Sequence, residues 1–222
     1  MGKTLSASAL NGTKRESASP QARILEVARE LFCRDGIHAT GIDRILSDAG
    51  ASKMTLYARF GSKTGLLRAV LLEEGEEWRD RFFAQLGTVG ADPAAQLRAV
   101  IPALKTWFSG ERFYGCAFMN AVAEHQKEEP WLRELAAAHH RQILAKLDDL
   151  AERAGYAEPP LLARQLLLLI DGTIAALMVS GDPLVLDIAS RNLDAILSTA
   201  QRTGPGNDVR GDTSDRIGPT GK

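Results

Sequence analysis

Hydrophobic side chains recur at intervals of three and four residues through most of the chain, and no stretch alternates apolar and polar residues as a half-buried strand does. The first helical segment covers about residues 21–34, where Ile24 and Leu31 fall on one side of the helical wheel. Gly36 then supplies the left-handed conformation that ends a helix. The pattern predicts an all-α fold.

Two short helices are predicted next, over about residues 42–49 and 53–60, with Gly50 in the tight turn between them. Ser52 is a suitable N-cap for the second of them. After a break at Gly61, a long fourth helix begins, which Ser62 can cap. Its apolar stripe consists of Leu67, Leu71, Trp78 and Phe82.

The remainder predicts five more helices and therefore nine in all, with prolines near several first turns. Their approximate ranges are 93–109, 114–127, 130–155, 160–180 and 183–201.

The last predicted helix has two apolar faces, so it can bury one in its own core and offer the other to a second copy. One face carries Val185, Ile188 and Ile196, and the other carries Leu186, Leu193 and Leu197. We therefore expect a homodimer that forms through the last two helices.

Composition narrows the class of protein. The 222 residues, 45% hydrophobic and 25% charged, exclude a disordered chain and a disulfide-stapled miniprotein. The net charge is −1, but residues 1–65 hold ten Lys/Arg against six Asp/Glu, whereas residues 66–222 hold seventeen against twenty-two. The N-terminal segment is thus weakly basic and the rest of the chain is acidic, so only the N-terminal segment suits binding to a polyanion.

The terminal segments, the cysteines and the apolar runs predict the cellular compartment of the protein. Residues 1–20 and 203–222, rich in small and polar residues, are expected to be flexible tails. Cys33 and Cys116 are too few to staple the chain and are expected to be reduced thiols. No signal peptide is recognised, and Asp171 interrupts the longest apolar run. These features predict a soluble cytoplasmic protein without a membrane span.

The two short helices and their turn follow the helix-turn-helix plan, in which the second helix enters the major groove of DNA. Hydroxyl, phenol and cationic side chains surround the second helix, and they suit phosphates and base edges. They are Lys53, Thr55, Tyr57, Arg59 and Lys63. The alternative is a small helical hairpin with an ordinary solvated face.

Residues 24–67, ILEVARELFCRDGIHATGIDRILSDAGASKMTLYARFGSKTGLL, resemble the DNA-binding domain of TetR-type transcriptional repressors. The resemblance implies a dimer of about nine helices per chain that binds double-stranded operator DNA. It also implies that Thr40, Lys53, Thr55, Tyr57 and Lys63 contact phosphates or the groove. Arg44 and Arg59 are the candidates for base reading, because arginine bonds bidentately to guanine.

Two positions depart from the family's pattern. Gly41 stands where a hydroxyl residue is usual, and Met54 stands where glycine is common. A further, shorter likeness lies in GERFYGCAFMNAVAEH, which resembles a segment of one subgroup of the family's C-terminal domains.

The resemblance divides the chain into a helix-turn-helix domain at 21–65 and a ligand-binding and dimerisation domain at 66–202. A small effector is expected to bind in the second domain and to lower DNA affinity by linkage. The candidate lining residues mix aromatic, apolar and polar groups, although any of them can instead be ordinary core. They are Trp78, Phe82, Trp107, Phe108, Met119, Asn120, His139, Asp171 and Thr173.

Other classes of function lack supporting motifs. No phosphate-binding loop, nucleophile elbow or HExxH pair occurs, so an enzyme is not expected. The histidines and cysteines lack the spacing of a local chelate, so neither a metal nor another cofactor is expected. The competing interpretation is an architectural helix-turn-helix protein that binds DNA without a ligand. Activation in place of repression also stays open.

Overall fold

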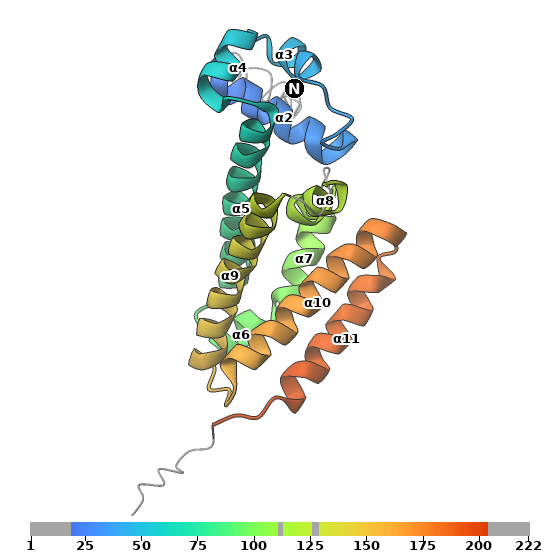
Figure 1. Cartoon of the computed structure of the whole chain (residues 1–222). Coiled ribbons are helices and arrows are strands. Elements are labelled where there is room, and N and C mark those ends of the chain that lie inside the picture. The colour runs from blue at the N-terminus through green and yellow to red at the C-terminus, as the bar shows by residue number, and fades with distance from the viewer. Residues whose placement is uncertain (1–18, 111–112, 126–128, 204–222) are drawn as a thin grey trace, which may run out of the picture.

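The computed structural model describes residues 19–110, 113–125 and 129–203, and within these ranges the chain forms ten helices and no strand (Figure 1). This confirms the all-α prediction. The predicted tails lie almost wholly outside the described residues. The helices are α2 (Pro20–Asp35), α3 (Ile42–Ala49), α4 (Lys53–Phe60), α5 (Lys63–Gly87), α6 (Pro93–Arg98), α7 (Val100–Phe108), α8 (Ala117–Glu124), α9 (Pro130–Arg153), α10 (Pro159–Ser180) and α11 (Leu184–Thr199).

Helices α2, α3 and α4 form one end of the molecule, and α5 runs from them along the body toward α6 (Figure 1). Ile24, Ile45 and Leu56 are completely buried where the three short elements meet. The bounds of α3 and α4 agree with the predicted 42–49 and 53–60. The predicted stripe of α5 is buried along its whole length.

The single helix predicted over 93–109 is wrong, because the chain forms α6 and α7 with a break at Ala99. Pro102 explains the break. It has no N–H for the carbonyl of Arg98, and in a continuous helix its ring would clash with that carbonyl. In the structure Pro102 lies in the first turn of α7, where proline is tolerated. The described residues therefore contain ten helices rather than nine.

Helix α8 is shorter than the predicted 114–127. Gly115 has a φ of +81°, so the chain cannot be helical there, and Cys116 is the N-cap. Glu124 ends the helix, and residues 126–128 lie outside the described part.

Two hydrophobic cores hold the protein together. The larger joins α5, α6, α7, α9, α10 and α11. The smaller fills the helix-turn-helix end and also takes in Phe118, Ala121 and Leu132, which come from α8 and α9. The two cores are thus connected through α8, which lies between them.

Helix α10 is long and apolar enough to cross a membrane, with a mean hydropathy of 1.7 over its most apolar window. In this structure 44% of that window is buried, and α10 packs against α9, α11 and α7. Core helices of water-soluble proteins have the same composition. The packing agrees with the expectation of burial in protein.

Candidate nucleic-acid interface and ligand cavity

The turn between α3 and α4 is held by an arginine of α2. Arg23 donates from Nε to the carbonyl oxygen of Ala49 at 2.8 Å and from Nη2 to that of Gly50 at 3.0 Å. Gly50 has a φ of +56°, a conformation that glycine adopts without steric cost. Arg23 of α2 therefore helps to fix the angle between α3 and α4. Sequence reasoning missed Arg23, which carries no motif signal.

Ser52 caps α4, as predicted. Its hydroxyl accepts the N–H of Thr55 at 3.1 Å, and the hydroxyls of Ser52 and Thr55 lie 2.9 Å apart. Thr55 is half-buried and contributes to this cap. Leu56, one position further, is completely buried and anchors α4 to the core.

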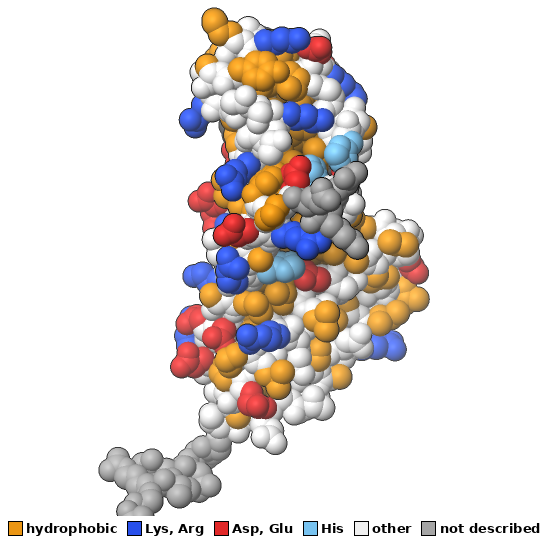
Figure 2. Space-filling view, viewed as in Figure 1, with side chains coloured by type: hydrophobic (Ala, Val, Ile, Leu, Met, Phe, Trp, Pro, Cys, Tyr) orange, Lys and Arg blue, Asp and Glu red, His pale blue; other side chains and the backbone are white. Residues whose placement is uncertain are grey.

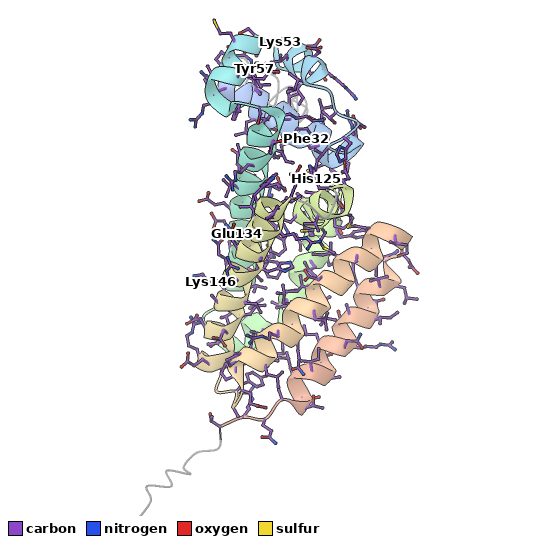
Figure 3. The ribbon with its side chains drawn as sticks, viewed as in Figure 1. Phe32, Lys53, Tyr57, His125, Glu134 and Lys146 are labelled. Atoms are coloured by element: carbon purple, nitrogen blue, oxygen red, sulfur yellow. The ribbon has the colours of Figure 1, made fainter. Side chains whose placement is uncertain are left out.

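The opposite side of α4 faces outward at the end of the molecule, where Figure 3 places Lys53 and Tyr57. Tyr57 is 48% exposed and Met54 is 80% exposed. Lys53 pairs with Asp43 of α3 at 2.8 Å, and this hydrogen bond raises the pKa of Lys53. Arg59 is exposed and has no ion pair among the described residues. A phenol, a thioether and two cations of α4 are thus accessible, with Tyr57 between Lys53 and Met54 on one side of the helix and Arg59 on another.

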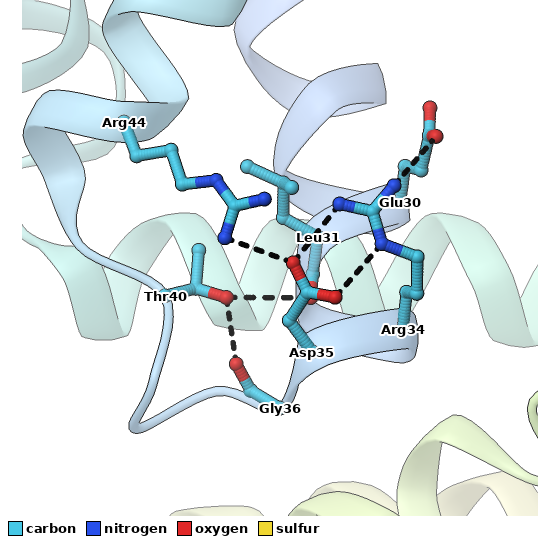
Figure 4. Close-up of polar contacts among 7 residues, drawn as sticks. All are labelled: Glu30, Leu31, Arg34, Asp35, Gly36, Thr40 and Arg44. Atoms are coloured by element: carbon cyan, nitrogen blue, oxygen red, sulfur yellow. Dashed lines mark hydrogen bonds and ion pairs between the residues drawn. The ribbon is translucent and has the colours of Figure 1, made fainter.

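Arg44, a candidate for base reading, is committed to a contact within the protein. Its guanidinium pairs with Asp35 at 2.9 Å, and Arg34 holds the same carboxylate at 2.8 Å (Figure 4). The hydrogen bond from Arg34 lowers the pKa of Asp35, so this carboxylate stays charged. Arg44 must leave Asp35 before it can read a base, which makes Arg59 the better candidate.

The structure corrects the expected role of the Thr40 side chain. Thr40 has no exposed surface, and its hydroxyl donates to the carbonyl oxygens of Gly36 at 2.7 Å and Leu31 at 3.3 Å (Figure 4). The hydroxyl therefore braces the loop between α2 and α3 instead of facing a phosphate. Gly36 begins this loop and Leu31 lies in α2, so the hydroxyl ties the loop to the end of the helix.

Lys63 begins α5 beside α4, and Ser62 caps this helix as predicted, accepting the N–H of Gly65 at 3.0 Å. Partial burial lowers the pKa of Lys63. Gly65 is required by packing, because a Cβ atom there would collide with the backbone oxygen of Phe60. The junction between α4 and α5 thus depends on glycine at position 65.

A contact that sequence reasoning missed joins the helix-turn-helix end to α8. Glu124 Oε2 accepts the backbone N–H groups of Ile37 at 2.7 Å and His38 at 3.1 Å. His38 Nε2 donates in return to the carbonyl oxygen of Glu124 at 2.9 Å. His125 lies at the same junction, with its ring 5.0 Å from that of His38, and Figure 3 places it at the end of the body that faces the helix-turn-helix. The contact joins segments 87 positions apart, so no local sequence pattern marks it.

A cavity of about 20 Å³ lies between α5, α7, α8, α9 and α10. This volume holds about one water molecule. Four of the predicted ligand-binding residues line it: Trp78, Trp107, His139 and Asp171. The lining residues that sequence reasoning missed are Glu74, Gly75, Gly115, Cys116, Ala117, Phe118, His140, Ile143, Ile170 and Ile174.

The structure places the other five predicted ligand-binding residues elsewhere. Phe82 lines a separate groove between α5 and α7. Phe108 packs on Phe113, and Met119 packs against the larger core. Asn120 donates to the carbonyl oxygen of Tyr114 at 2.9 Å. Thr173 donates to that of Leu169 at 2.6 Å and lines the surface groove between α10 and α11.

His139 is buried at the cavity wall as the neutral imidazole. Arg79 donates to its Nδ1 at 2.8 Å, which requires Nδ1 to be unprotonated. Burial, together with the charge of Arg79, lowers the pKa of His139 to about 3. The ring stacks on Phe118 with centroids 4.2 Å apart. The neighbouring His140 instead lies 3.5 Å from the carboxylate of Asp171.

The groove between α10 and α11 is open and mainly apolar, and Figure 2 shows hydrophobic side chains exposed on this flank. Leu168 is 74% exposed and Ile188 is 51% exposed. Leu186 and Leu193, on the other face of α11, are buried. The two apolar faces predicted for this helix therefore have different environments. The groove is lined by Gln165, Leu168, Leu169, Gly172, Thr173, Ala176, Val185, Ile188, Ala189, Asn192, Ala195 and Ile196.

Neither metal chemistry nor thiol chemistry has support in the described ranges. No group of three His, Cys, Asp or Glu side chains there could hold a metal ion. Both cysteines are free thiols. Burial raises the pKa of Cys33 to about 12 and also raises that of Cys116, so both are poor nucleophiles at neutral pH.

Comparison with known proteins identifies the helix-turn-helix. The family model described as bacterial regulatory proteins of the tetR family matches residues 24–70. The transcriptional regulator UidR of Escherichia coli K12 is 33% identical over 73 residues, which cover 33% of this chain and only 37% of UidR. The transcriptional regulator AcrR of Shigella flexneri is 25% identical over 75% of this chain and 80% of its own length.

The likeness to solved structures extends over both parts of the molecule. The TetR-family transcriptional regulator SCO4454 of Streptomyces coelicolor superposes with a TM-score of 0.73 and 30% identity, covering 81% of this chain and 94% of its own. The match includes the helix-turn-helix and the helical remainder. This chain belongs to the TetR family of DNA-binding transcriptional regulators, which are not enzymes.

Proposed function

We propose that this protein is a cytoplasmic homodimeric repressor that binds a palindromic operator and is released by a small-molecule effector. The observation that carries the proposal is the accessible surface of α4, where Lys53, Tyr57 and Arg59 are exposed while Leu56 anchors the helix in the core. A recognition helix needs such a division between a packed side and a side that can meet the groove. Repression is the usual action in the family.

The first test measures DNA binding. The purified protein and its Tyr57→Ala variant are titrated against the intergenic DNA upstream of its own gene at low salt. Tyr57→Ala should lose DNA binding without losing the dimer, because its side chain is outside the core. Glu134→Ala, at an exposed position on α9 away from α4, is the matched control. Failure of the unmodified protein to bind at low salt contradicts the proposal.

The α10–α11 groove supports the dimer, because burying it against a second copy removes exposed apolar side chains from water. Leu168→Glu places a charge in the groove and should give a monomer in analytical ultracentrifugation. Leu72→Glu, at a leucine that is 53% exposed on α5, should leave the dimer intact. A dimer that survives Leu168→Glu contradicts this interface.

The division into a DNA-binding domain at 21–65 and a ligand-binding domain at 66–202 is part of the proposal. Helix α8 supplies a physical path between them: Ala117 and Phe118 line the cavity, and Glu124 binds the loop between α2 and α3. An effector that presses on Phe118 acts on the same helix that carries this contact.

One observation favours a second candidate function. The cavity is small, as expected for an architectural DNA-binding protein that has no effector. A thermal-shift screen with amphiphiles, organic cations, acyl thioesters and metals separates the two functions. A ligand that raises the melting temperature and releases the DNA supports the effector-controlled repressor. Bound DNA that no ligand releases supports the architectural protein.

A further inference from the structure

The cavity between α5, α7, α8, α9 and α10 has two carboxyl groups in its wall. Asp171 comes from α10, the most apolar helix, and Glu74 comes from α5. Their side chains are only 27% and 22% exposed. Burial raises the pKa of both, because it removes water from the charged form. Each carboxylate therefore gains if a cation comes close.

Neither carboxyl has a short ion pair in the described residues. The contact of Asp171 with His140 is 3.5 Å long and attractive only when His140 is protonated. The contact of Glu74 with Arg29 is 3.6 Å long, whereas Arg29 lies 2.6 Å from Glu77 and 2.8 Å from Glu26. The protein's own cations leave both carboxylates incompletely neutralised.

Two further cations lie near these carboxyl groups, and neither lines the cavity. Arg81 attracts Glu74 through space but has its ion pair with Glu77, at 3.9 Å. Arg79 is turned to Nδ1 of His139 and keeps that imidazole neutral. Arg79 itself is absent from the lining. An anionic ligand would be repelled by the two carboxylates, and a neutral ligand can offer them hydrogen bonds but no charge. A cation therefore stabilises them most.

The remaining wall is aromatic and aliphatic. The rings of Trp78 and Trp107 meet edge to face with centroids 5.8 Å apart, and the Phe118 ring belongs to the same lining. Indole faces attract cations most strongly among the aromatic side chains. Ile143 and Ile174 add apolar surface that suits a hydrocarbon body.

The cavity can enlarge at two flexible contacts. Met178 packs so closely against Gly115 that a Cβ atom at Gly115 would collide with the methionine side chain. Phe118 packs in the same way against Gly75. Methionine changes rotamer easily, so movement of Met178 opens space beside Gly115, which lines the cavity. The 20 Å³ cavity thus lies behind movable side chains.

We propose that this cavity binds a small organic cation, an ammonium group attached to an apolar or aromatic body, with the charge at Asp171 and Glu74 and the body against Trp78 and Trp107. The inference rests on the proposed effector-controlled function and names the chemical class of the effector. The binding requires no metal and no covalent step.

Three probes that share one body separate charge from shape: 2-phenylethylammonium, 2-phenylethanol and phenylacetate. Binding is followed by the fluorescence of the tryptophans and by melting temperature at pH 7.5. The ammonium compound should bind at least tenfold more tightly than the alcohol, and phenylacetate should bind most weakly. Equal or tighter binding of the alcohol or of phenylacetate overturns the proposal, and so does the absence of binding by all three.

Variants assign the charge recognition to a residue. Asp171→Asn keeps the size of the side chain. It should lower the affinity for the ammonium compound at least tenfold and leave the affinity for the alcohol almost unchanged. Glu152→Gln, an exposed carboxyl on α9 about three turns from His140, should change neither affinity. Equal effects of the two variants overturn the assignment. If circular dichroism shows that Asp171→Asn does not fold, the proposal is decided by the selectivity of the unmodified protein among the three probes.

The same preparations are titrated with DNA, which separates this inference from the proposed function. Protein that binds its DNA but does not prefer the ammonium probe contradicts the cation site alone. Protein that binds no DNA at low salt contradicts the proposed function, whatever the cavity binds.

Discussion

The carboxylate of Glu124 on α8 accepts a 2.7 Å hydrogen bond from the backbone N–H of Ile37, which lies 87 positions earlier in the chain. The N–H of His38 donates to the same oxygen at 3.1 Å. Helix α8 also presents Phe118 to the cavity. A single eight-residue helix thus contacts both the loop that precedes α3 and the proposed effector site.

Glu124→Ala should destabilise the protein by about 2 kcal/mol, because it removes a charged acceptor and leaves two backbone donors without it. Unfolding in urea measures the change. Glu134→Ala, an exposed glutamate on α9, should alter the free energy of unfolding by less than about 0.5 kcal/mol. Similar losses in the two variants would show that the Glu124 contact contributes little.

Gly65→Ala should prevent the native junction of α4 and α5, since the added Cβ would collide with the backbone oxygen of Phe60. The backbone cannot yield as a flexible side chain does, so a loss of more than about 2 kcal/mol is expected. Gly87→Ala is the control in the same helix, because its Cβ meets nothing within 4 Å. Thermal unfolding measures the stability of both variants. A Gly65→Ala variant that is as stable as the unmodified protein would contradict the close contact between position 65 and Phe60.

The elements that the sequence predicted best are those with local signals. Gly50, Ser52 and Ser62 bound α3, α4 and α5 correctly, because caps and left-handed glycines act over one helical turn. The single helix over 93–109 was wrong although Pro102 carried the signal for its break. Periodicity alone continues through such a break, because α6 and α7 both bury apolar faces in the same core.

The candidate sites depended on contacts between distant segments, which no local pattern reveals. Thr40 matched a family motif, yet its hydroxyl is buried against Gly36 and Leu31. Trp78 and Asp171 were predicted for the cavity, whereas Phe118 and Glu74 were missed. An aromatic side chain at helical spacing looks the same in sequence whether it packs in a core or lines a cavity.

Acidification should destabilise the protein through His139. Its pKa of about 3 in the folded state is below its value near 6.5 in the unfolded chain, so the unfolded state binds more protons between these values. The sign is therefore a loss of stability as the pH falls from 6.5 toward 3. Between pH 7.5 and 5.5 the loss should be about 1 kcal/mol.

Unfolding in urea at the two pH values, for the unmodified protein and for His139→Gln, measures the contribution of His139. The variant should be less stable at pH 7.5, because it disturbs the contacts with Arg79 and Phe118. The change in its free energy of unfolding between the two pH values should nevertheless be smaller than that of the unmodified protein by about 1 kcal/mol. An unchanged difference would assign the pH dependence to other groups.

Thr40→Val should lower the free energy of unfolding by about 1 kcal/mol, because the buried hydroxyl and its 2.7 Å hydrogen bond to the Gly36 carbonyl oxygen are lost. DNA affinity, measured well below the melting temperature, should stay within about threefold of the unmodified protein. This combination identifies a bracing residue. A large loss of affinity in fully folded Thr40→Val would instead assign the hydroxyl to DNA.

Lys53→Ala should have the opposite effects. Lys53 is 65% exposed, and its pair with Asp43 is surrounded by water, so the melting temperature should not change. The slope of log affinity against log salt should fall in magnitude by about 1 for each half-site, because one phosphate contact releases about one counterion. Lys146→Ala, at an exposed position on α9 far from α4, should leave the slope unchanged. Equal slopes for Lys53→Ala and Lys146→Ala would remove Lys53 from the DNA-binding surface, whereas a reduced slope for Lys53→Ala alone shows that the outer face of α4 lies against phosphates.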